Sequence, residues 1–171
     1  MLRELEEKLD EWLEKEFDIS DVARAFILGI TFVSLGVIIH ESAHKLTAIL
    51  LGCPASIVNI DMYFGATSVA NSCPSNYMIL IALAGPFVSM IYGLLCWYSG
   101  ENTITRFAGN IFLAFSVLPN LLPWVEYTDM GRAIQYGLNP VVAYMLWALP
   151  SAYIFWIWAT EVVDRKKLIN Y

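Results

Sequence analysis

The chain has 171 residues, of which 58% are hydrophobic and only 15% are charged. Soluble domains carry about 25% charged residues, so this composition excludes an ordinary soluble domain and indicates a membrane protein. The net charge of −6 excludes the basic face that nucleic-acid binding requires, and no nucleic-acid partner is expected. The length suits a single domain, residues 1–171.

Residues 1–20 are predicted to form an acidic amphipathic helix. Leu2, Leu5, Leu9 and Trp12 recur at helical spacing, while Glu and Lys fill the other face. Anionic lipid head groups repel such a helix, so it is expected to pack on protein. We interpret it as a solvated extension or as the contact of a homo-oligomer through residues 2–19, and a lid over the functional site is an open alternative.

The first membrane span is predicted from Val22 to Leu51. Capping oxygens precede it, and Gly52-Cys53-Pro54 ends it. At about 1.5 Å per residue this helix is about 45 Å long, which exceeds a hydrocarbon core of about 30 Å. The span must therefore tilt or protrude from the bilayer.

The same span carries the only two histidines of the chain, His40 and His44, with Glu41 beside the first. Residues four apart lie on one face of a helix, so the two imidazoles could bind one metal ion. Glu41 could then handle a proton next to that ion. Ionisable groups within a membrane span are costly and usually mark a functional site.

Residues 55–71 have a different character and predict a short β-hairpin. Two β-prone runs, 56–64 and 66–70, are expected to be joined around Gly65, and a plain loop is the alternative. Unpaired strands are not tolerated in lipid, so the hairpin must lie at the interface or be buried in protein. Cys53 and Cys73 flank it and could pair in an oxidising compartment or in a thermophile's cytosol, but the sequence leaves their pairing open.

Three further spans complete the predicted fold. They cover about 77–98, interrupted by Ala84-Gly85-Pro86, then 107–122, broken by the prolines of 119–123, and 140–160. A polar loop at 101–106 and a short polar helix with Asp129 and Arg132 connect them, and Arg132 is interpreted as a helix-end or interfacial charge. The predicted fold is mostly α: a polytopic membrane protein with about four transmembrane helices and both termini on one side. Residues 22–135 form its core and 139–171 its last span and tail.

A catalytic zinc site has three protein ligands and one position for water, so a third ligand is needed. Besides Glu41, few acidic residues lie between 22 and 160: Asp61, Glu101, Glu126 and Asp129. Glu101 falls on the wrong side of the second span, and Asp61 is explained as an exposed strand residue. Asp129 follows the proline-broken third span and is the predicted ligand, with Glu126 as the alternative.

Three motifs, in this order, resemble the site-2 protease family of intramembrane zinc metalloproteases. His-Glu-x-x-His begins at His40. Ala-Gly-Pro-Phe-Val-Ser covers 84–89, with Ser89 where the family has a small or amide residue. Asn-Leu-Leu-Pro at 120–123 precedes Asp-Met-Gly-Arg at 129–132. The resemblance covers about residues 25–135, with one extra residue between Asn120 and Asp129 and Met130 where the family has glycine.

The resemblance implies peptide-bond hydrolysis with one zinc ion per chain, bound by His40, His44 and Asp129. Glu41 would act as general base, and Asn120 would hydrogen-bond the substrate carbonyl or the oxyanion. The alternative for Asn120 is an amide that satisfies backbone groups freed by Pro123. The implied substrates are membrane-anchored proteins cut within or near the bilayer, and the expected location is the cell membrane. A locally unwound substrate could add to the hairpin edge at 56–62 or 66–71.

Two other functions stay open, and so does the orientation. A catalytically inactive membrane scaffold of the same fold could bind zinc or a helix. A metal transporter is less favoured, because the sequence offers one compact ligand cluster and no relay along other spans. Lys and Arg cluster near the termini and in 101–106, which favours cytoplasmic ends. Relatives of the family, however, usually place the metal near the cytosolic face.

Overall fold

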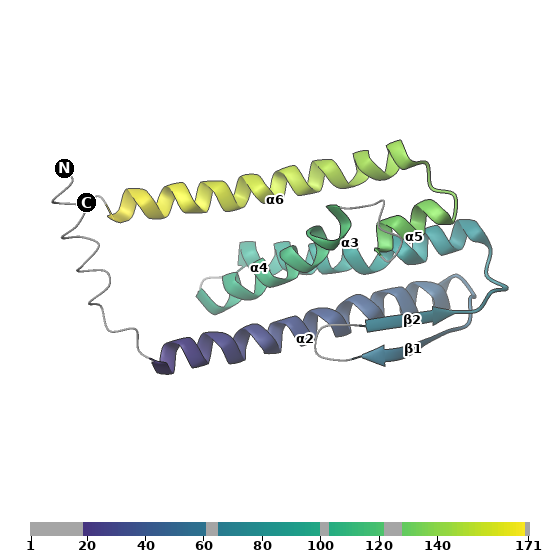
Figure 1. Cartoon of the computed structure of the whole chain (residues 1–171), viewed down its shortest axis with the longest axis horizontal. Helices are drawn as coiled ribbons and strands as arrows, with labels where there is room; N and C mark the ends of the chain where they lie inside the picture. Colours follow the sequence, from purple (N-terminus) through teal and green to yellow (C-terminus); the bar gives the residue numbers. More distant parts are fainter. Residues whose placement is uncertain (1–18, 61–64, 100–102, 122–127, 170–171) are drawn as a thin grey trace.

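A computed structural model describes residues 19–60, 65–99, 103–121 and 128–169. Four long helices run along the long axis of the molecule, and a hairpin and a short helix lie at one end (Figure 1). The elements are, in order, α2 (Ile19–Leu50), β1 (Ala55–Ile60), β2 (Gly65–Val69), α3 (Ser75–Ser99), α4 (Thr103–Val117), a 3-10 turn η1 (Pro119–Leu121), α5 (Asp129–Gln135) and α6 (Pro140–Ile169). The predicted N-terminal helix and its oligomer contact lie outside the described residues.

Within the described residues, four segments are long and apolar enough to cross a membrane, which confirms the predicted polytopic fold. They are Phe26–Leu50, Ser75–Ser99, Ile104–Leu121 and Pro140–Thr160. Large apolar side chains such as Leu149 and Trp156 are exposed on their outer surfaces, where water would be unfavourable and lipid is suitable. The start of α2 and the end of α6 lie at the same end of the bundle (Figure 1).

Glycines end the helices that carry the site residues. Gly52 adopts a positive φ of 75°, its N–H bonds to the Ile49 carbonyl at 3.0 Å, and the Cys53 N–H bonds to the Ala48 carbonyl at 2.8 Å. This is a Schellman C-cap, which satisfies the last carbonyls of α2. Gly137, with φ 105°, ends α5 with the same pair of bonds.

The hairpin is confirmed, with different strand bounds. β1 and β2 pair antiparallel, with Ile57 opposite Thr67 and Ile60 opposite Gly65. Gly65 is therefore the first residue of β2, at the end of the hairpin around which the two strands were predicted to join. Cys53 and Cys73 form a disulfide across the base of the hairpin, which resolves the pairing that the sequence left open. Asp61 lies outside the described residues.

Two predicted breaks are continuous helix in the structure. α3 runs through Pro86, which is buried, so the expected interruption at 84–86 is wrong. α4 begins at Thr103, so residues 103–106 are helical rather than loop. The break after α4 is confirmed: Pro119 cannot donate an N–H to continue the helix, and the 3-10 turn η1 follows.

α3 is the central element of the bundle. It packs against α2, α4 and α5, and Figure 1 shows α3 and α4 between α2 and α6. One apolar cluster ties α3 and α4 to α6 through Met90, Leu113 and Ile154. A second joins the end of α2 to α3 beneath the hairpin, and a third seats Met130 of α5 against Trp147 of α6. These contacts hold the ends of α2 and α5 against α3, where the candidate site lies.

Candidate metal centre

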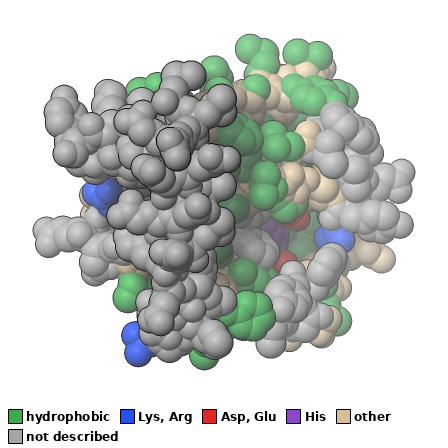
Figure 2. All heavy atoms as spheres, turned by 60° about the vertical axis from the view of Figure 1, so that its left-hand side comes forward, with side chains coloured by type: hydrophobic (Ala, Val, Ile, Leu, Met, Phe, Trp, Pro, Cys, Tyr) green, Lys and Arg blue, Asp and Glu red, His purple; other side chains and the backbone are tan. Residues whose placement is uncertain are grey.

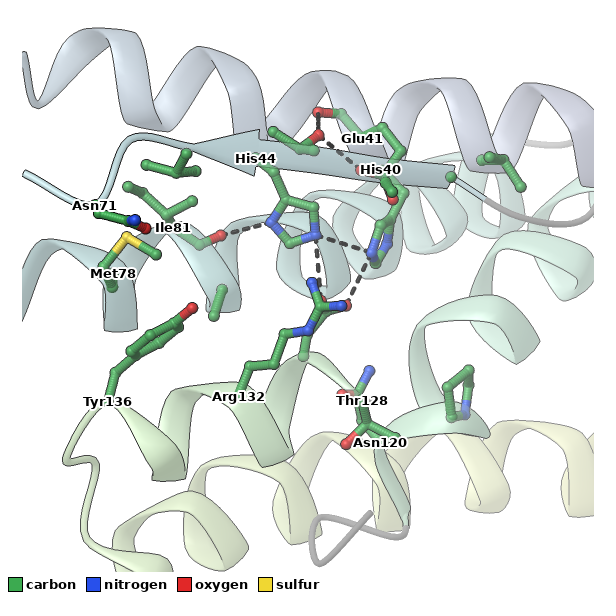
Figure 3. Close-up of a pocket in the computed structure, with 18 residues that line it drawn as sticks. His40, Glu41, His44, Asn71, Met78, Ile81, Asn120, Thr128, Arg132 and Tyr136 are labelled. Atoms are coloured by element: carbon green, nitrogen blue, oxygen red, sulfur yellow. Dashed lines mark hydrogen bonds and ion pairs between the residues drawn. The ribbon is translucent and has the colours of Figure 1, made fainter. Parts of the chain in front are cut away.

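Three side chains that could bind a metal converge where α2, α3 and α5 meet. His40 and His44 extend from one face of α2 toward α5 (Figure 3), whose first residue is Asp129. Their nearest nitrogens are 3.0 Å apart, with His40 Nε2 2.9 Å from Asp129 Oδ2 and His44 Nε2 3.4 Å from Asp129 Oδ1. The three ligand atoms all lie within 4.8 Å of one another. Two histidines and one aspartate at such distances could hold a metal ion.

The far side of each imidazole is bonded to α3. His44 Nδ1 lies 2.6 Å from the Ile81 carbonyl, which can only accept, so Nδ1 carries the proton. His40 Nδ1 lies 3.4 Å from the Ser89 hydroxyl. Such bonds fix the ring orientation and the tautomer of metal-binding histidines. In neutral His44 the Nε2 lone pair therefore faces His40 and Asp129.

Asp129 is held in place by the start of α5. Thr128 caps the helix by accepting from the Gly131 N–H at 3.0 Å. Asn120 of η1 accepts from the Met130 N–H at 3.0 Å and donates to the Ser116 carbonyl at 3.0 Å. Met130 itself is fully buried. The carboxylate position thus depends on η1 and α4 as well as on α5.

The geometry and the chemistry of the three groups fit a tetrahedral cation. Bonds of about 2.0–2.1 Å to such an ion separate its ligand atoms by about 3.3 Å, close to the observed 2.9–3.4 Å. With the imidazole protons on the outward nitrogens, two lone pairs and a carboxylate face one another, and a shared proton or a metal ion between them relieves that arrangement. Two imidazoles and a carboxylate are a ligand set typical of catalytic zinc.

Gly85 of α3 leaves room for both imidazoles. A Cβ built at this position would lie 2.4 Å from His44 Nε2 and 2.6 Å from His40 Nε2. From the sequence, Gly85 is expected only as part of an interruption of the second span and of the motif at 84–89. Its position shows a more specific reason, since any side chain here would occupy the place where the two nitrogens meet.

Glu41 extends toward the hairpin, away from the two imidazoles (Figure 3). Its carboxylate Oε2 accepts a hydrogen bond of 2.7 Å from the Thr67 hydroxyl of β2, and its side chain is only 6% exposed. The neighbouring residue in the sequence, His40, faces α5. Both side chains nevertheless line one cavity, together with Thr67 of the hairpin and Asp129 of α5.

That cavity has a volume of about 440 Å³ and is open to the outside. Figure 2 shows histidine and carboxylate atoms at the bottom of a hollow surrounded by hydrophobic side chains. Arg132 of α5, Tyr136 directly after α5 and Asn71 after β2 lie on its wall. Arg132, interpreted from sequence as a helix-end or interfacial charge, is exposed and lines this cavity. A cavity of this size can take an extended peptide segment beside the three ligand atoms.

The charge of Asp129 is stabilised by its neighbours. Burial alone would raise the pKa of the carboxyl, but the hydrogen bonds with His40 and His44 outweigh it and hold the pKa well below its usual range. The carboxylate is therefore charged at neutral pH and available as a ligand.

A family model described as Peptidase M50B-like matches residues 22–163 of the chain. The chain belongs to this family. It is the site-2 protease family, so the resemblance inferred from the three motifs is confirmed. Comparison with curated proteins and with solved structures found no match. The matched segment contains every residue named around the metal centre.

The structure brings together most of the residues predicted for the site of this M50B-like protein. His40, His44 and Asp129 converge, and Asn120 lines the cavity while its bonds to Ser116 and Met130 are those expected of a structural amide. The alternative ligand Glu126 lies outside the described residues, as do Asp61 and Glu101. Sequence reasoning missed Thr67 and the close approach of Gly65 and Gly85, because only the packing of β2 and α3 on α2 reveals them.

Proposed function

We propose that this protein is an intramembrane zinc endopeptidase that hydrolyses peptide bonds of membrane-anchored proteins. The observation that carries the proposal is the convergence of His40, His44 and Asp129 beside an open cavity, in an M50B-like chain with four candidate spans. One zinc ion per chain would be held by these three residues. The cell membrane is the proposed location.

A zinc ion held there would lower the pKa of a water and polarise the scissile carbonyl. Glu41 lines the same cavity and serves as the general base, taking a proton from the water and passing it to the leaving amine. Asn120 has a second amide proton besides the one donated to Ser116, and it donates that proton to the substrate carbonyl. The Ile81 carbonyl and the Ser89 hydroxyl, both on α3, keep the imidazoles oriented throughout.

The substrate has to reach the cavity as an extended strand, because a helix keeps its carbonyls hydrogen-bonded. β2 supplies four residues of the cavity wall, Gly65, Ala66, Thr67 and Val69. A substrate segment that pairs with this hairpin would be held unwound beside the metal centre. Strand addition therefore gives the hairpin a role in substrate binding.

The test uses Glu41→Gln, which keeps the size of the side chain and removes its basicity. Purified wild-type protein is expected to cleave a reporter with a single transmembrane helix, and Glu41→Gln to retain zinc but lose cleavage by at least about 100-fold. Zinc content and cleavage are measured on the same preparations. Equal cleavage by both proteins would contradict the proposal and leave the inactive, zinc-binding scaffold as the better account.

A further inference from the structure

We propose that Thr67 is a positioning residue, whose hydroxyl holds the Glu41 carboxylate in the orientation in which it accepts a proton. Gly65, two residues earlier in β2, leaves the space that this orientation needs. The inference rests on the proposed function, because it assigns Thr67 a role in the same reaction.

The contact between Thr67 and Glu41 is short and partly buried. Thr67 Oγ1 lies 2.7 Å from Glu41 Oε2 and 3.2 Å from the backbone carbonyl of Glu41. A hydroxyl has one proton to donate, and the shorter contact to a charged acceptor is the stronger of the two. Within the described part of the chain, no other hydrogen bond to this carboxylate is found. Oε2 is thereby anchored, and Oε1 remains available to take a proton.

Gly65 brings the backbone of β2 directly against the same side chain. A Cβ at Gly65 would lie 2.2 Å from Glu41 Cγ and 2.8 Å from Glu41 Cδ. Neither distance is possible between unbonded atoms, so any other residue at 65 has to push the carboxylate away. Two independent contacts from one strand therefore fix where Glu41 lies.

The hairpin is suited to hold a side chain in place. Thr67 pairs with Ile57 of β1, and the strand alternates so that Gly65, Thr67 and Val69 face inward while Ser68 is exposed. The disulfide between Cys53 and Cys73 closes the base of the hairpin. A glutamate has several rotatable bonds, and a fixed donor selects one arrangement of them before substrate binds.

The decisive variant is Thr67→Val, which removes the hydroxyl and keeps the shape. Loss of a hydrogen bond to a charged group is expected to lower kcat by about 10- to 100-fold, with KM and zinc content unchanged. Cleavage is measured with an unfolded casein probe and with a single-span reporter protein. Thr67→Ser restores the hydroxyl and is expected to recover most of the activity. Thr31→Val makes the same change at a threonine bonded to the Ile27 carbonyl, on the distant part of α2, and should leave kcat unchanged.

A second readout does not depend on activity. Thr67→Val is expected to lower the thermal unfolding midpoint of metal-free protein by about 3–10 °C. In the Glu41→Gln background the same substitution should lower it by clearly less, because the charged acceptor is gone. Gly65→Ala should lower kcat while zinc content stays at the wild-type level.

Three results would overturn the inference. They are a kcat of Thr67→Val within about twofold of wild type, additive shifts of the unfolding midpoint in the two backgrounds, or equal losses in Thr67→Val and Thr67→Ser. Each of these leaves the proposed function intact. Equal cleavage by wild type and Glu41→Gln would instead refute the proposed function, and the unfolding cycle would still test the contact between Thr67 and Glu41.

Discussion

Gly85 illustrates how a missing side chain can define a metal centre. Both imidazole Nε2 atoms lie within 2.6 Å of the place where its Cβ would be. A methyl group at this point must displace one ring or move α3 away from α2, and either movement separates the ligand atoms. The glycine of the Ala-Gly-Pro motif is therefore explained by the two histidines that pack against it.

Gly85→Ala is expected to weaken zinc binding by at least about 100-fold, while the protein remains helical and membrane-bound. Zinc affinity is measured by competition with a chelator of known affinity. Gly29→Ala is the matched control: its added Cβ would lie 4.0 Å from the nearest atom, on Phe107. The control should bind zinc like the wild type and gain up to about 1 kcal/mol of stability. Equal zinc affinity in both variants would contradict this account of Gly85.

Asn120 is a buried amide whose hydrogen bonds in the structure are local. It joins the Ser116 carbonyl of α4 to the Met130 N–H of α5, next to Asp129. Removing the amide frees the start of α5 and the carboxylate on it. The residue therefore affects the metal site whether or not it also touches substrate.

Asn120→Ala is expected to weaken zinc binding by about 10- to 100-fold, because it loosens the third ligand. Asn110→Ala is the control, since it removes a bond of 2.8 Å to Trp158 Nε1 on α6, away from the centre. Zinc affinity is again measured by chelator competition. If Asn120→Ala lowered kcat alone and left zinc affinity unchanged, its role would be catalytic and not structural.

At the scale of elements, the hairpin depends on its attachment to the ends of α2 and α3. Cys53 is buried, and with Cys73 it joins an apolar cluster that includes Ala48 and Ile81. Ile81 is also the residue whose carbonyl orients His44. The disulfide, the hairpin and the histidine support are thus parts of one region.

Replacing both Cys53 and Cys73 by serine is expected to cost about 3 kcal/mol of stability, since the disulfide closes a loop of 20 residues in the unfolded chain. The measurement is the thermal unfolding midpoint under non-reducing conditions. Cys96→Ser, at the free cysteine of α3, should leave the midpoint nearly unchanged. The disulfide assignment would be wrong if a reducing agent lowered the midpoint of the double variant as much as that of the wild type.

At the scale of the whole molecule, hydropathy predicts the spans well. Each of the four predicted spans overlaps a described helix, and the spacing of His40 and His44 on α2 requires no tertiary information. The breaks were less predictable. Proline ended a helix at Pro119, but not at Pro86, where buried packing of α3 continues the helix. The residues next to each proline do not distinguish the two cases, because the outcome depends on how the segment packs against neighbouring helices.

The third ligand shows where sequence reasoning needs tertiary structure. His40 and Asp129 are separated by 89 positions, and no local pattern connects them. The small number of acidic residues in the spans made Asp129 a candidate, and the packing of α5 against α3 brings it to the histidines. Thr67 and Gly65 carried no recognisable motif, because their importance depends on where β2 crosses α2.

The most direct test of the account is zinc-edge X-ray absorption on the purified protein, combined with zinc content. The wild type is predicted to hold one zinc per chain with two imidazole nitrogens and a carboxylate oxygen among its ligands, at about 2.0–2.2 Å. Asp129→Ala should lose most of this zinc and the carboxylate contribution to the spectrum. One zinc per chain with an unchanged spectrum in Asp129→Ala would contradict the central claim.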